Sequence, residues 1–212
     1  MSFPRLLYLA SSNKGKLREF RQAASACGIE LHVVPGFDRL PPCQEDQLTF
    51  QDNARKKASY YSSLTTGLVF ADDSGISVEA LGGQPGIHAA RFAGPDATDA
   101  QNNAKLLEEL ARRPGASRSA QYVCCIALAA QQQILGVFEG TVRGVIVDTP
   151  KGSNGFGYDP YFFYPPLGKT FAELTPEEKF AVSHRGNAFR KLLEFLTASQ
   201  FRPCSAGHLD LP

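Results

Sequence analysis

The chain has 212 residues, of which 43% are hydrophobic and 20% are charged, and its formal net charge is +1. This composition is typical of a soluble globular protein with one large domain or two small lobes. A net charge so close to zero excludes a bulk attraction to nucleic acid or to an anionic membrane, so any anion must be held by local charges. The first apolar run is too short to predict a signal peptide or a membrane-spanning helix.

The cysteines favour a reducing environment. There are five of them, without the spacing of a metal site, and Cys124 and Cys125 are adjacent inside an apolar run. An odd number of cysteines does not indicate a disulfide framework. We therefore expect free, buried thiols and a cytoplasmic location.

The first half of the chain alternates apolar runs with stretches of helical periodicity. In chain order, it predicts a strand at 6–10, a helix at 16–27, a strand at 29–34, a helix from Thr49 to residue 64 and a strand at 68–72. Gly28 is a typical residue just past a helix end. Thr49 followed by Asp52 is a loose form of the capping box. The intervening loop, 36–47, is rich in proline and acidic residues.

The second half contains two long apolar segments that predict neighbouring strands. In chain order, it predicts a helix at 99–112, a strand at 120–130, a turn at 131–133, a strand at 134–148, a helix beginning at Pro176 and a helix at 187–199. Thr98 with Gln101, and Thr175 with Glu178, are capping boxes. Strands and helices mix without strict alternation, which predicts an α/β or α+β fold with a mixed sheet.

A polar turn joins the first predicted strand to the first predicted helix. Its residues are Ser11, Ser12, Asn13, Lys14, Gly15 and Lys16. Backbone N–H groups and the helix dipole favour an anion at such a place, and the lysines strengthen that interpretation. The alternative is a capped turn with solvent-exposed lysines, which is common. In an exposed turn, replacing Lys16 with alanine is expected to cost little stability.

Two adjacent carboxylates, Asp72 and Asp73, stand at the predicted end of the strand 68–72. Neighbouring strand residues point to opposite faces of a sheet, so the two need not share a role. Carboxylates at a sheet end suit Mg²⁺ with a phosphate ligand. A turn or helix N-cap made by Asp73 and Ser74 is the alternative. Glu45, in the loop before the second helix, is a distant second source of metal ligands.

A glycine-rich loop carries aromatic side chains next to an acid. Phe156 and Tyr158 alternate with glycines and precede Asp159. Glycines allow close approach of a flat ligand, and an aromatic ring offers it a stacking face. The alternative is a glycine-rich turn whose aromatic side chains lie in the core.

Basic residues stand near the start of the last helix. His184 and Arg185 open it, and Lys179 lies a few residues upstream. These side chains can meet a ligand, although a surface His–Arg pair is the more common arrangement.

Together these clusters resemble the inosine triphosphate pyrophosphatase family (Ham1/RdgB type). The segments that carry the resemblance are LASSNKGKLREF, LTFQDNARKKA, ADDSGISVEALGGQPGIHAARFAG, GFGYDPYFF and FAELTPEEKFAVSHRGNA. The resemblance covers nearly all of the chain except its last dozen residues. It implies an elongated α/β fold with a long mixed sheet, flanking helices and two lobes around a central cleft. Residues 1–200 would form this single domain and 201–212 a tail, and the protein would be a homodimer.

The resemblance also implies an activity, namely Mg²⁺-dependent hydrolysis of ITP, dITP and XTP to the monophosphate and pyrophosphate. It implies Asp73 as proton acceptor, Lys16 as a second catalytic residue, and Glu45 with Asp73 as metal ligands, with Asp72 in support. The implied substrate contacts are Ser11, Ser12, Asn13, Lys14, Gly15, Lys16, Ser74, Phe156, Gly157, Tyr158, Asp159, Lys179, His184 and Arg185. The expected partner is a small nucleotide, not nucleic acid or a membrane.

Base selection is expected at the last helix. A 6-oxo purine presents an acceptor where adenine presents an amino donor, and Arg185 with backbone N–H groups near His184 suits that acceptor. The sequence also allows two other functions. A nucleotide-binding regulatory protein without turnover is disfavoured by the presence of Asp73, Glu45 and Lys16. A Maf-like enzyme that hydrolyses other nucleotides is disfavoured by GFGYDP together with SHRG.

Overall fold

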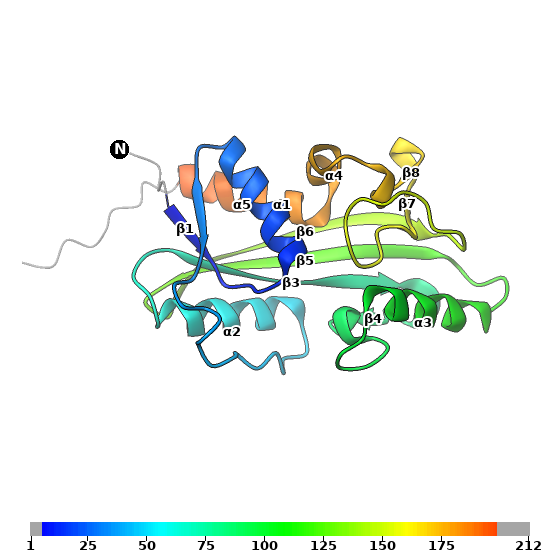
Figure 1. The fold of residues 1–212 in the computed structure, drawn as a ribbon, viewed down its shortest axis with the longest axis horizontal. Coiled ribbons are helices and arrows are strands. Elements are labelled where there is room, and N and C mark those ends of the chain that lie inside the picture. The colour runs from blue at the N-terminus through cyan, green and yellow to red at the C-terminus, as the bar shows by residue number, and fades with distance from the viewer. Residues whose placement is uncertain (1–5, 199–212) are drawn as a thin grey trace, which may run out of the picture.

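The computed structural model of the protein describes residues 6–198. Figure 1 shows an elongated molecule built on one long sheet with helices on both of its faces. No helix within 6–198 is both long enough and apolar enough to span a membrane. The predicted tail, 201–212, and the predicted domain end at residue 200 lie outside the described residues.

Within residues 6–198, the sheet has eight strands and is mixed. The strands are β1 (Leu6–Leu9), β2 (Glu30–Val33), β3 (Val69–Val78), β4 (Pro85–Gly86), β5 (Ser119–Ala130), β6 (Gln133–Ile146), β7 (Phe162–Tyr164) and β8 (Lys169–Thr170). Their order is β2-β1-β3-β5-β6-β7-β8, and β4 pairs with β3 off this path. β1 runs parallel to β2 and β3, and the other pairs are antiparallel. The prediction of an α/β fold with a long mixed sheet is confirmed.

Helices cover both faces of this sheet. The α-helices are α1 (Lys14–Ala26), α2 (Phe50–Ser62), α3 (Asp99–Ala111), α4 (Pro176–Val182) and α5 (His184–Ala198). In Figure 1, α1, α4 and α5 lie on one face, and α2 and α3 lie on the other. Four 3₁₀ turns connect these elements: η1 (Glu79–Leu81), η2 (Ala89–Arg91), η3 (Pro165–Leu167) and η4 (Phe171–Glu173).

The predicted helix starts depend on local signals, and most of them are confirmed. The Thr49 side chain accepts a hydrogen bond from the Asp52 N–H at 3.0 Å, and both predicted capping boxes are formed, at α3 and at α4. α1 begins earlier than predicted, at Lys14, because the side chain of Asn13 accepts from the Lys16 N–H at 3.0 Å. The first turn of α1 therefore contains Lys14, Gly15 and Lys16, and the other predicted anion-binding residues, Ser11, Ser12 and Asn13, stand just before it.

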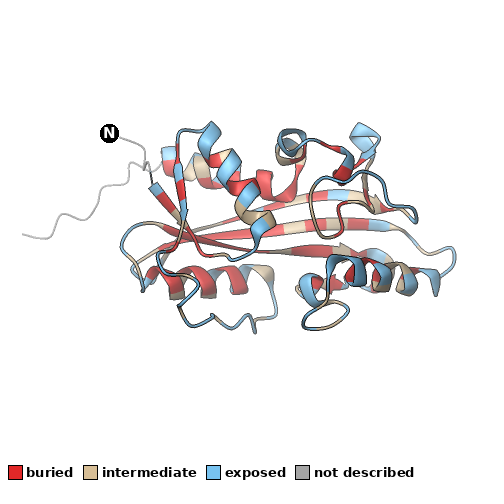
Figure 2. Ribbon diagram, in the orientation of Figure 1, coloured by how far each residue is buried: buried red, intermediate tan, exposed pale blue. Residues whose placement is uncertain are grey.

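Buried side chains give each end of the sheet its own core, as the red segments of Figure 2 show. One cluster lies under α1 and α5, a second lies under α2 at the same end, and a third lies beside α3 at the other end. Representative members are Phe20 and Phe189 in the first, Ala54 and Tyr61 in the second, and Leu106, Tyr122 and Phe162 in the third.

The thiols are only partly as expected. Cys27, Cys43, Cys124 and Cys125 are all unpaired, and Cys124 and Cys125 are buried. The expectation of burial is wrong for Cys27, which is exposed at the end of α1, and for Cys43, which is partly exposed in the loop before α2. The fifth cysteine, Cys204, lies outside the described residues.

The strand that carries the two carboxylates is longer than predicted. β3 continues through Asp72 and Asp73 to Val78, and it pairs with β5 along its whole length. The Asp-Asp-Ser-Gly run has the composition of a turn, but pairing with the apolar strand β5 keeps it extended. The alternative of a turn or helix N-cap at Asp73 and Ser74 is therefore wrong.

The other edge of β3 is only partly covered. β1 pairs with Val69 and Phe70, and β4 pairs with Ile76 and Ser77, so residues 71–75 lie between the two partners. β4 comes close because its neighbour on β3 is Gly75, where an added Cβ would stand 2.2 Å from the carbonyl oxygen of Gly86. The carboxylates consequently lie at a gap in the sheet edge, beside the carboxyl end of β1, which is a usual place for a ligand in such sheets.

Close packing of α5 on β6 depends on Gly140. An added Cβ there would lie 2.1 Å from the carbonyl oxygen of His184 and 2.4 Å from the backbone nitrogen of Ala188. Gly140→Ala is therefore expected to destabilise the protein by roughly 1–3 kcal/mol or more, measured by thermal or urea unfolding. Gly136→Ala, on the same strand, is the control, because the atoms nearest to its Cβ would belong to the Phe138 side chain and not to the backbone. Equal losses in the two variants would contradict this tight contact.

Candidate active site

A cleft of about 610 Å³ opens at the gap in the edge of β3. Its walls come from the turn after β1, the loop before α2, β3, η2, the first turn of α3, β5, the loop before β7 and the start of α5. Twelve of the predicted site residues line it: Ser11, Ser12, Asn13, Lys16, Glu45, Asp73, Ser74, Phe156, Gly157, Tyr158, Asp159 and Arg185. Segments that are far apart in sequence therefore meet in one cavity.

The other four predicted residues stand back from the cleft. Lys14 is exposed and Gly15 is half-buried, both in the first turn of α1. Lys179 and His184 are buried behind the cleft wall, so they act on a ligand in the cleft only through neighbouring groups in this conformation. Gly15 has no room for a side chain, because a Cβ would lie 2.5 Å from the Phe156 ring.

The N-terminus of α1 is built to receive negative charge. Its first turn has no acidic residue and carries Lys14 and Lys16, although cations are unfavourable at that end of the helix dipole. An anion in front of the helix would remove this conflict and would bond to its free N–H groups. Ser11 and Ser12 line the cleft just before this turn.

Asp72 and Asp73 have different surroundings because their side chains leave opposite faces of β3. The Asp72 carboxylate is fully buried, and it pairs with Lys16 Nζ at 2.7 Å and with Arg185 Nε at 3.9 Å. These two cations lower the pKa of Asp72 against the effect of its burial, so it stays ionised. Asp72 thus fixes Lys16 from behind and does not line the cleft.

Asp73 faces α2 and the cleft. It accepts hydrogen bonds from Asn53 Nδ2 at 3.0 Å and from the Ser74 N–H at 3.1 Å. Burial raises its pKa, and Glu45 and Asp72 raise it further, although Lys57 opposes them. A buried carboxylate with a raised pKa is a better proton acceptor than an ordinary aspartate.

Lys57, which the sequence analysis missed, links the two proposed metal ligands. Its Nζ lies 3.1 Å from Glu45 Oε2 and 3.7 Å from Asp73 Oδ1, and it donates to the main-chain oxygen of Asp72 at 2.7 Å. The available signal was its helical spacing, since Asn53, Lys57 and Tyr61 are four residues apart on the face of α2 that also carries its buried alanines. Polar residues on a buried helix face indicate a site.

This corner of the cleft suits a divalent cation. No group of three or more His, Cys, Asp or Glu side chains within 6–198 is arranged to hold a metal by itself. Glu45 and Asp73 nevertheless lie around one ammonium group, and the pKa of Asp73 is raised partly by excess negative charge. Mg²⁺ typically takes one or two protein carboxylates and completes its shell with phosphate and water. The donor set therefore fits Mg²⁺ that arrives with a phosphate ligand.

The glycine-rich loop forms another wall of the cleft, next to the first turn of α1. The Phe156 ring is half-buried, with Arg185 Cζ 4.8 Å and Lys179 Nζ 5.0 Å from its centroid. Tyr158 is instead part of the core, and its hydroxyl donates to the main-chain oxygen of Ala89 at 2.7 Å. For Tyr158, the alternative interpretation of a side chain that lies in the core is therefore correct. Phe156 is the stacking face that this loop offers.

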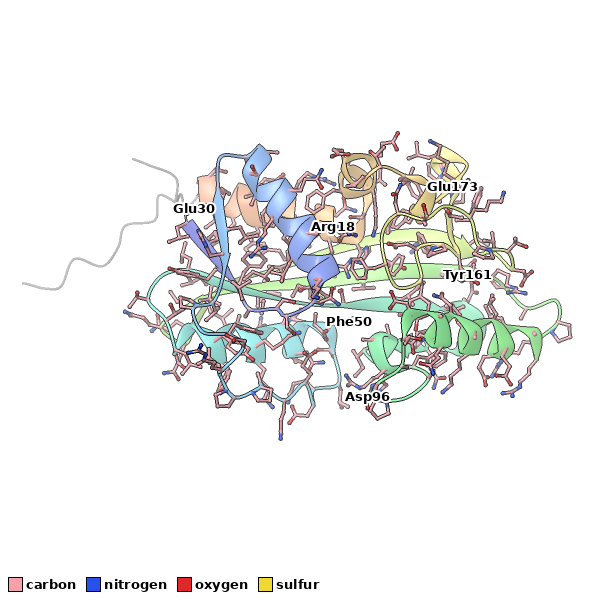
Figure 3. All side chains as sticks on the ribbon, viewed as in Figure 1. Arg18, Glu30, Phe50, Asp96, Tyr161 and Glu173 are labelled. Carbon is pink, nitrogen blue, oxygen red and sulfur yellow. The ribbon has the colours of Figure 1, made fainter. Side chains whose placement is uncertain are left out.

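The loop is fixed from both sides. The Phe156 N–H donates to Asp159 Oδ2 at 2.8 Å. From α3, Asp99 Oδ2 accepts from the Gly157 N–H at 2.6 Å, and Asn103 Nδ2 donates to the Gly157 oxygen at 2.9 Å. Gly157 has a φ of 64°, a conformation that glycine adopts without strain. Figure 3 shows Arg18 of α1 beside this loop. The Arg18 side chain donates to the main-chain oxygen of Gly155 at 3.4 Å.

Lys179 and Arg185 are buried and paired, and His184 is buried as well, so the alternative of a surface His–Arg pair is wrong. Glu19 of α1 accepts from Lys179 Nζ at 2.6 Å and from Arg185 at 3.1 Å, and Lys179 also bonds Asp159. Arg185 donates to Ser74 Oγ at 3.0 Å. α5 begins at His184, earlier than predicted, so Arg185 stands in its first turn. Glu19 is another residue that the sequence analysis missed, because it reads as one polar position of an amphipathic helix.

Comparison with known proteins places this cleft in a family. A model of the Ham1 family matches residues 7–195. A dITP/XTP pyrophosphatase of Streptococcus thermophilus is 46% identical over 93% of this chain, and one of Streptococcus agalactiae is 45% identical over 91%. The chain spans about three fifths of the length of these curated relatives, 61% and 60% respectively.

Solved structures agree with this match. A HAM1 protein from Coxiella burnetii superposes with a TM-score of 0.82 at 38% identity, over 92% of this chain and 99% of the other. A nucleoside-triphosphatase / dITP/XTP pyrophosphatase from Mycobacterium abscessus gives a TM-score of 0.66 at 39% identity, over 90% and 99%. On the extent of the family match and of these likenesses, the chain belongs to the Ham1 family.

Proposed function

We propose that the chain hydrolyses noncanonical purine nucleoside triphosphates, namely ITP, dITP and XTP, to the monophosphate and pyrophosphate, and so removes them from the nucleotide pool. The observation that carries this proposal is the composition of one cleft. The N-terminus of α1 with Lys16, the carboxylates of Glu45 and Asp73 with Lys57, and the Phe156 ring with Arg185 all line this one cavity. The names of the relatives from Streptococcus and Mycobacterium support the same reaction.

Mg²⁺ is part of the proposal, and Glu45 with Asp73 would hold it. When bound, it offsets charge on the triphosphate and supplies a Lewis acid. Asp73 accepts a proton from the attacking water, for which its raised pKa suits it. Lys16 and Lys57 stabilise the charge that develops on the phosphate oxygens. Asp72 holds Lys16 in place for this role.

Selection of the base is assigned to Arg185 and to the first-turn N–H groups of α5, which have no partner within the helix. These donors match the acceptor at position 6 of hypoxanthine or xanthine, and they would face the unmatched amino group of adenine. The Phe156 ring contributes stacking that does not distinguish purines, because every purine has the same kind of face.

A nucleotide panel tests the proposed function. Purified protein with Mg²⁺ is given ITP, dITP, XTP, GTP and ATP, and pyrophosphate and orthophosphate are measured separately. We expect pyrophosphate from the first three, little turnover of ATP, and loss of activity when the metal is chelated. Orthophosphate as the product, or ATP as the best substrate, would contradict the proposal. Full activity in chelator would remove Mg²⁺ from it.

We also propose a cytoplasmic homodimer. The family resemblance supports the dimer, and the four unpaired thiols within 6–198 support a reducing compartment. Light scattering coupled to size exclusion tests the dimer, because a monomeric mass at micromolar concentration would contradict it.

Lys16 is expected to serve both binding and stability. Lys16→Ala removes a cation from the anion site and leaves the buried carboxylate of Asp72 with Arg185 as its remaining cationic partner. The premise that Lys16 is exposed is wrong, because its side chain pairs with a buried carboxylate. We therefore expect a stability loss of about 3–5 kcal/mol, which is typical of breaking a buried pair. We expect a lower melting temperature and a raised KM for ITP.

A double mutant separates these two effects. Asp72→Asn in the Lys16→Ala background removes the charge that was left without its lysine, and it should restore part of the stability but not the KM. Unchanged stability in Lys16→Ala would contradict the buried ion pair, and unchanged kinetics would contradict the anion site.

A further inference from the structure

Tyr122 lies on β5 and lines the cleft, and the proposed reaction assigns it no role. Its side chain is buried, yet it lines the cleft between the glycine-rich loop and the start of α5. Its hydroxyl donates to Asp159 Oδ1 at 3.3 Å. Its ring is parallel to that of His184, with centroids 4.5 Å apart and an angle of 5° between the planes. One side chain therefore contacts both the glycine-rich loop and the first turn of α5.

The contact with Asp159 is specific to one oxygen. Asp159 Oδ2 accepts from the Phe156 N–H and from Lys179, and a Cβ added at Gly155 would lie 2.1 Å from it. Within the described residues, Tyr122 is the hydrogen-bond donor to Oδ1. A buried carboxylate oxygen without a donor is costly, so removal of this hydroxyl favours a different position of Asp159 and of the loop that it holds.

The contact with His184 holds a ring that lacks partners of its own. Neither Nδ1 nor Nε2 of His184 has a hydrogen-bond partner within the described part of the chain, although the side chain is buried. Burial, together with Arg185, Lys179 and Lys16, lowers the pKa of His184 well below its usual value, so its ring is neutral. A neutral imidazole has one donor and one acceptor, and burial of both without partners indicates a bond still to be made.

The ring of Tyr122 fixes the orientation of the His184 ring, and so the directions in which its nitrogens can form a hydrogen bond. Phe171 lies parallel to it as well, with centroids 5.8 Å apart and an angle of 8°, and Phe162 packs against it at 4.5 Å. These two phenylalanines are fully buried, so they keep Tyr122 from turning. Because the His184 ring stacks on Tyr122, its orientation is fixed as well.

We propose that Tyr122 is a positioning residue of the base-recognition end of the cleft, acting through its hydroxyl on Asp159 and through its ring on His184. This inference rests on the proposed function, because it takes that end of the cleft to receive the purine. It assigns to Tyr122 no role toward the triphosphate, for which Lys16, Lys57 and Asp73 are proposed.

The test compares binding of ITP with binding of inorganic tripolyphosphate, which has no base. Dissociation constants for both are measured by calorimetry for wild type, Tyr122→Phe, Tyr122→Leu and a control, Tyr164→Phe. Tyr164 is in the same aromatic cluster, 5.9 Å from Phe171, but it does not line the cleft. Tyr122→Phe removes only the hydroxyl and keeps the ring on His184, so it remains informative where the leucine variant does not fold.

We expect Tyr122→Phe to weaken ITP binding roughly tenfold, as for loss of a hydrogen bond to a charged group. Tyr122→Leu should weaken it further, because it also frees the His184 ring. Tripolyphosphate binding should stay unchanged in the phenylalanine variant, and the control should bind both as wild type does. An unchanged dissociation constant for ITP, or equal losses for ITP and tripolyphosphate, would overturn the proposal.

These outcomes can be distinguished from a failure of the proposed function. A wild-type protein that binds ITP but does not hydrolyse it refutes the reaction and still tests Tyr122, because binding needs no turnover. A wild-type protein that binds tripolyphosphate but not ITP refutes both.

Discussion

Replacing Asp73 with asparagine is expected to abolish turnover and to leave the fold intact. The change removes one negative charge and the proton acceptor but keeps the shape of the side chain. Loss of a positioned general base typically costs 10²–10⁴-fold in rate, and loss of a metal ligand adds to this. The measurement is kcat for ITP at saturating Mg²⁺ together with the melting temperature.

The fold should tolerate Asp73→Asn because burial already makes the charge of Asp73 unfavourable, as its raised pKa shows. Lys57 would keep its bonds to Glu45 and to the main-chain oxygen of Asp72. Asp72→Asn is the matched control on the opposite face of β3. It should lower stability more, since it deprives Lys16 and Arg185 of a buried partner. Near-normal kcat in Asp73→Asn would show that Asp73 is neither base nor essential ligand.

Arg185→Ala is expected to have the largest combined effect on stability and on selectivity. The guanidinium is buried, bonds Glu19 and Ser74, and lies over the Phe156 ring. Its removal leaves Glu19 with only Lys179 and should cost about 3–5 kcal/mol. For a chain of this size, the corresponding fall in melting temperature is roughly 6–20 °C.

Selectivity should change at the same time. We expect Arg185→Ala to lower kcat/KM for ITP much more than for any slow ATP reaction, and so to narrow the ITP:ATP ratio. Phe156→Ala is the comparison variant, because loss of stacking should lower both values by similar factors. Both variants are assayed at a temperature where unfolding curves show them folded. If Arg185→Ala keeps the wild-type ratio, the 6-oxo group is selected elsewhere, for example by Lys179 or by backbone groups.

The sequence by itself determined the features that depend on a few neighbouring residues. Helix starts at Thr49, Thr98 and Thr175 were predictable because a capping side chain bonds to a backbone group three residues later. The two segments beside residues 131–133 were predictable as strands because β5 is continuously apolar where its residues 124–129 are buried, while the middle of β6 alternates buried and less buried positions. The residue types of the site were visible for a similar reason, since each motif is a short run that resembles its counterpart in the family.

Only the tertiary structure decided how these motifs meet. β3 remains a strand through Asp72 and Asp73 because it pairs with β5, about fifty residues away, against its own turn-like composition. Arg185 and Glu19 are partners across 166 positions of sequence, and no periodicity in either helix specifies that bond. Lys57 and Tyr122 became visible as site residues only once their neighbours were known. Buried charged groups and aromatic rings act through partners that come into contact only when the chain folds. The residues next to them in the sequence do not indicate those partners.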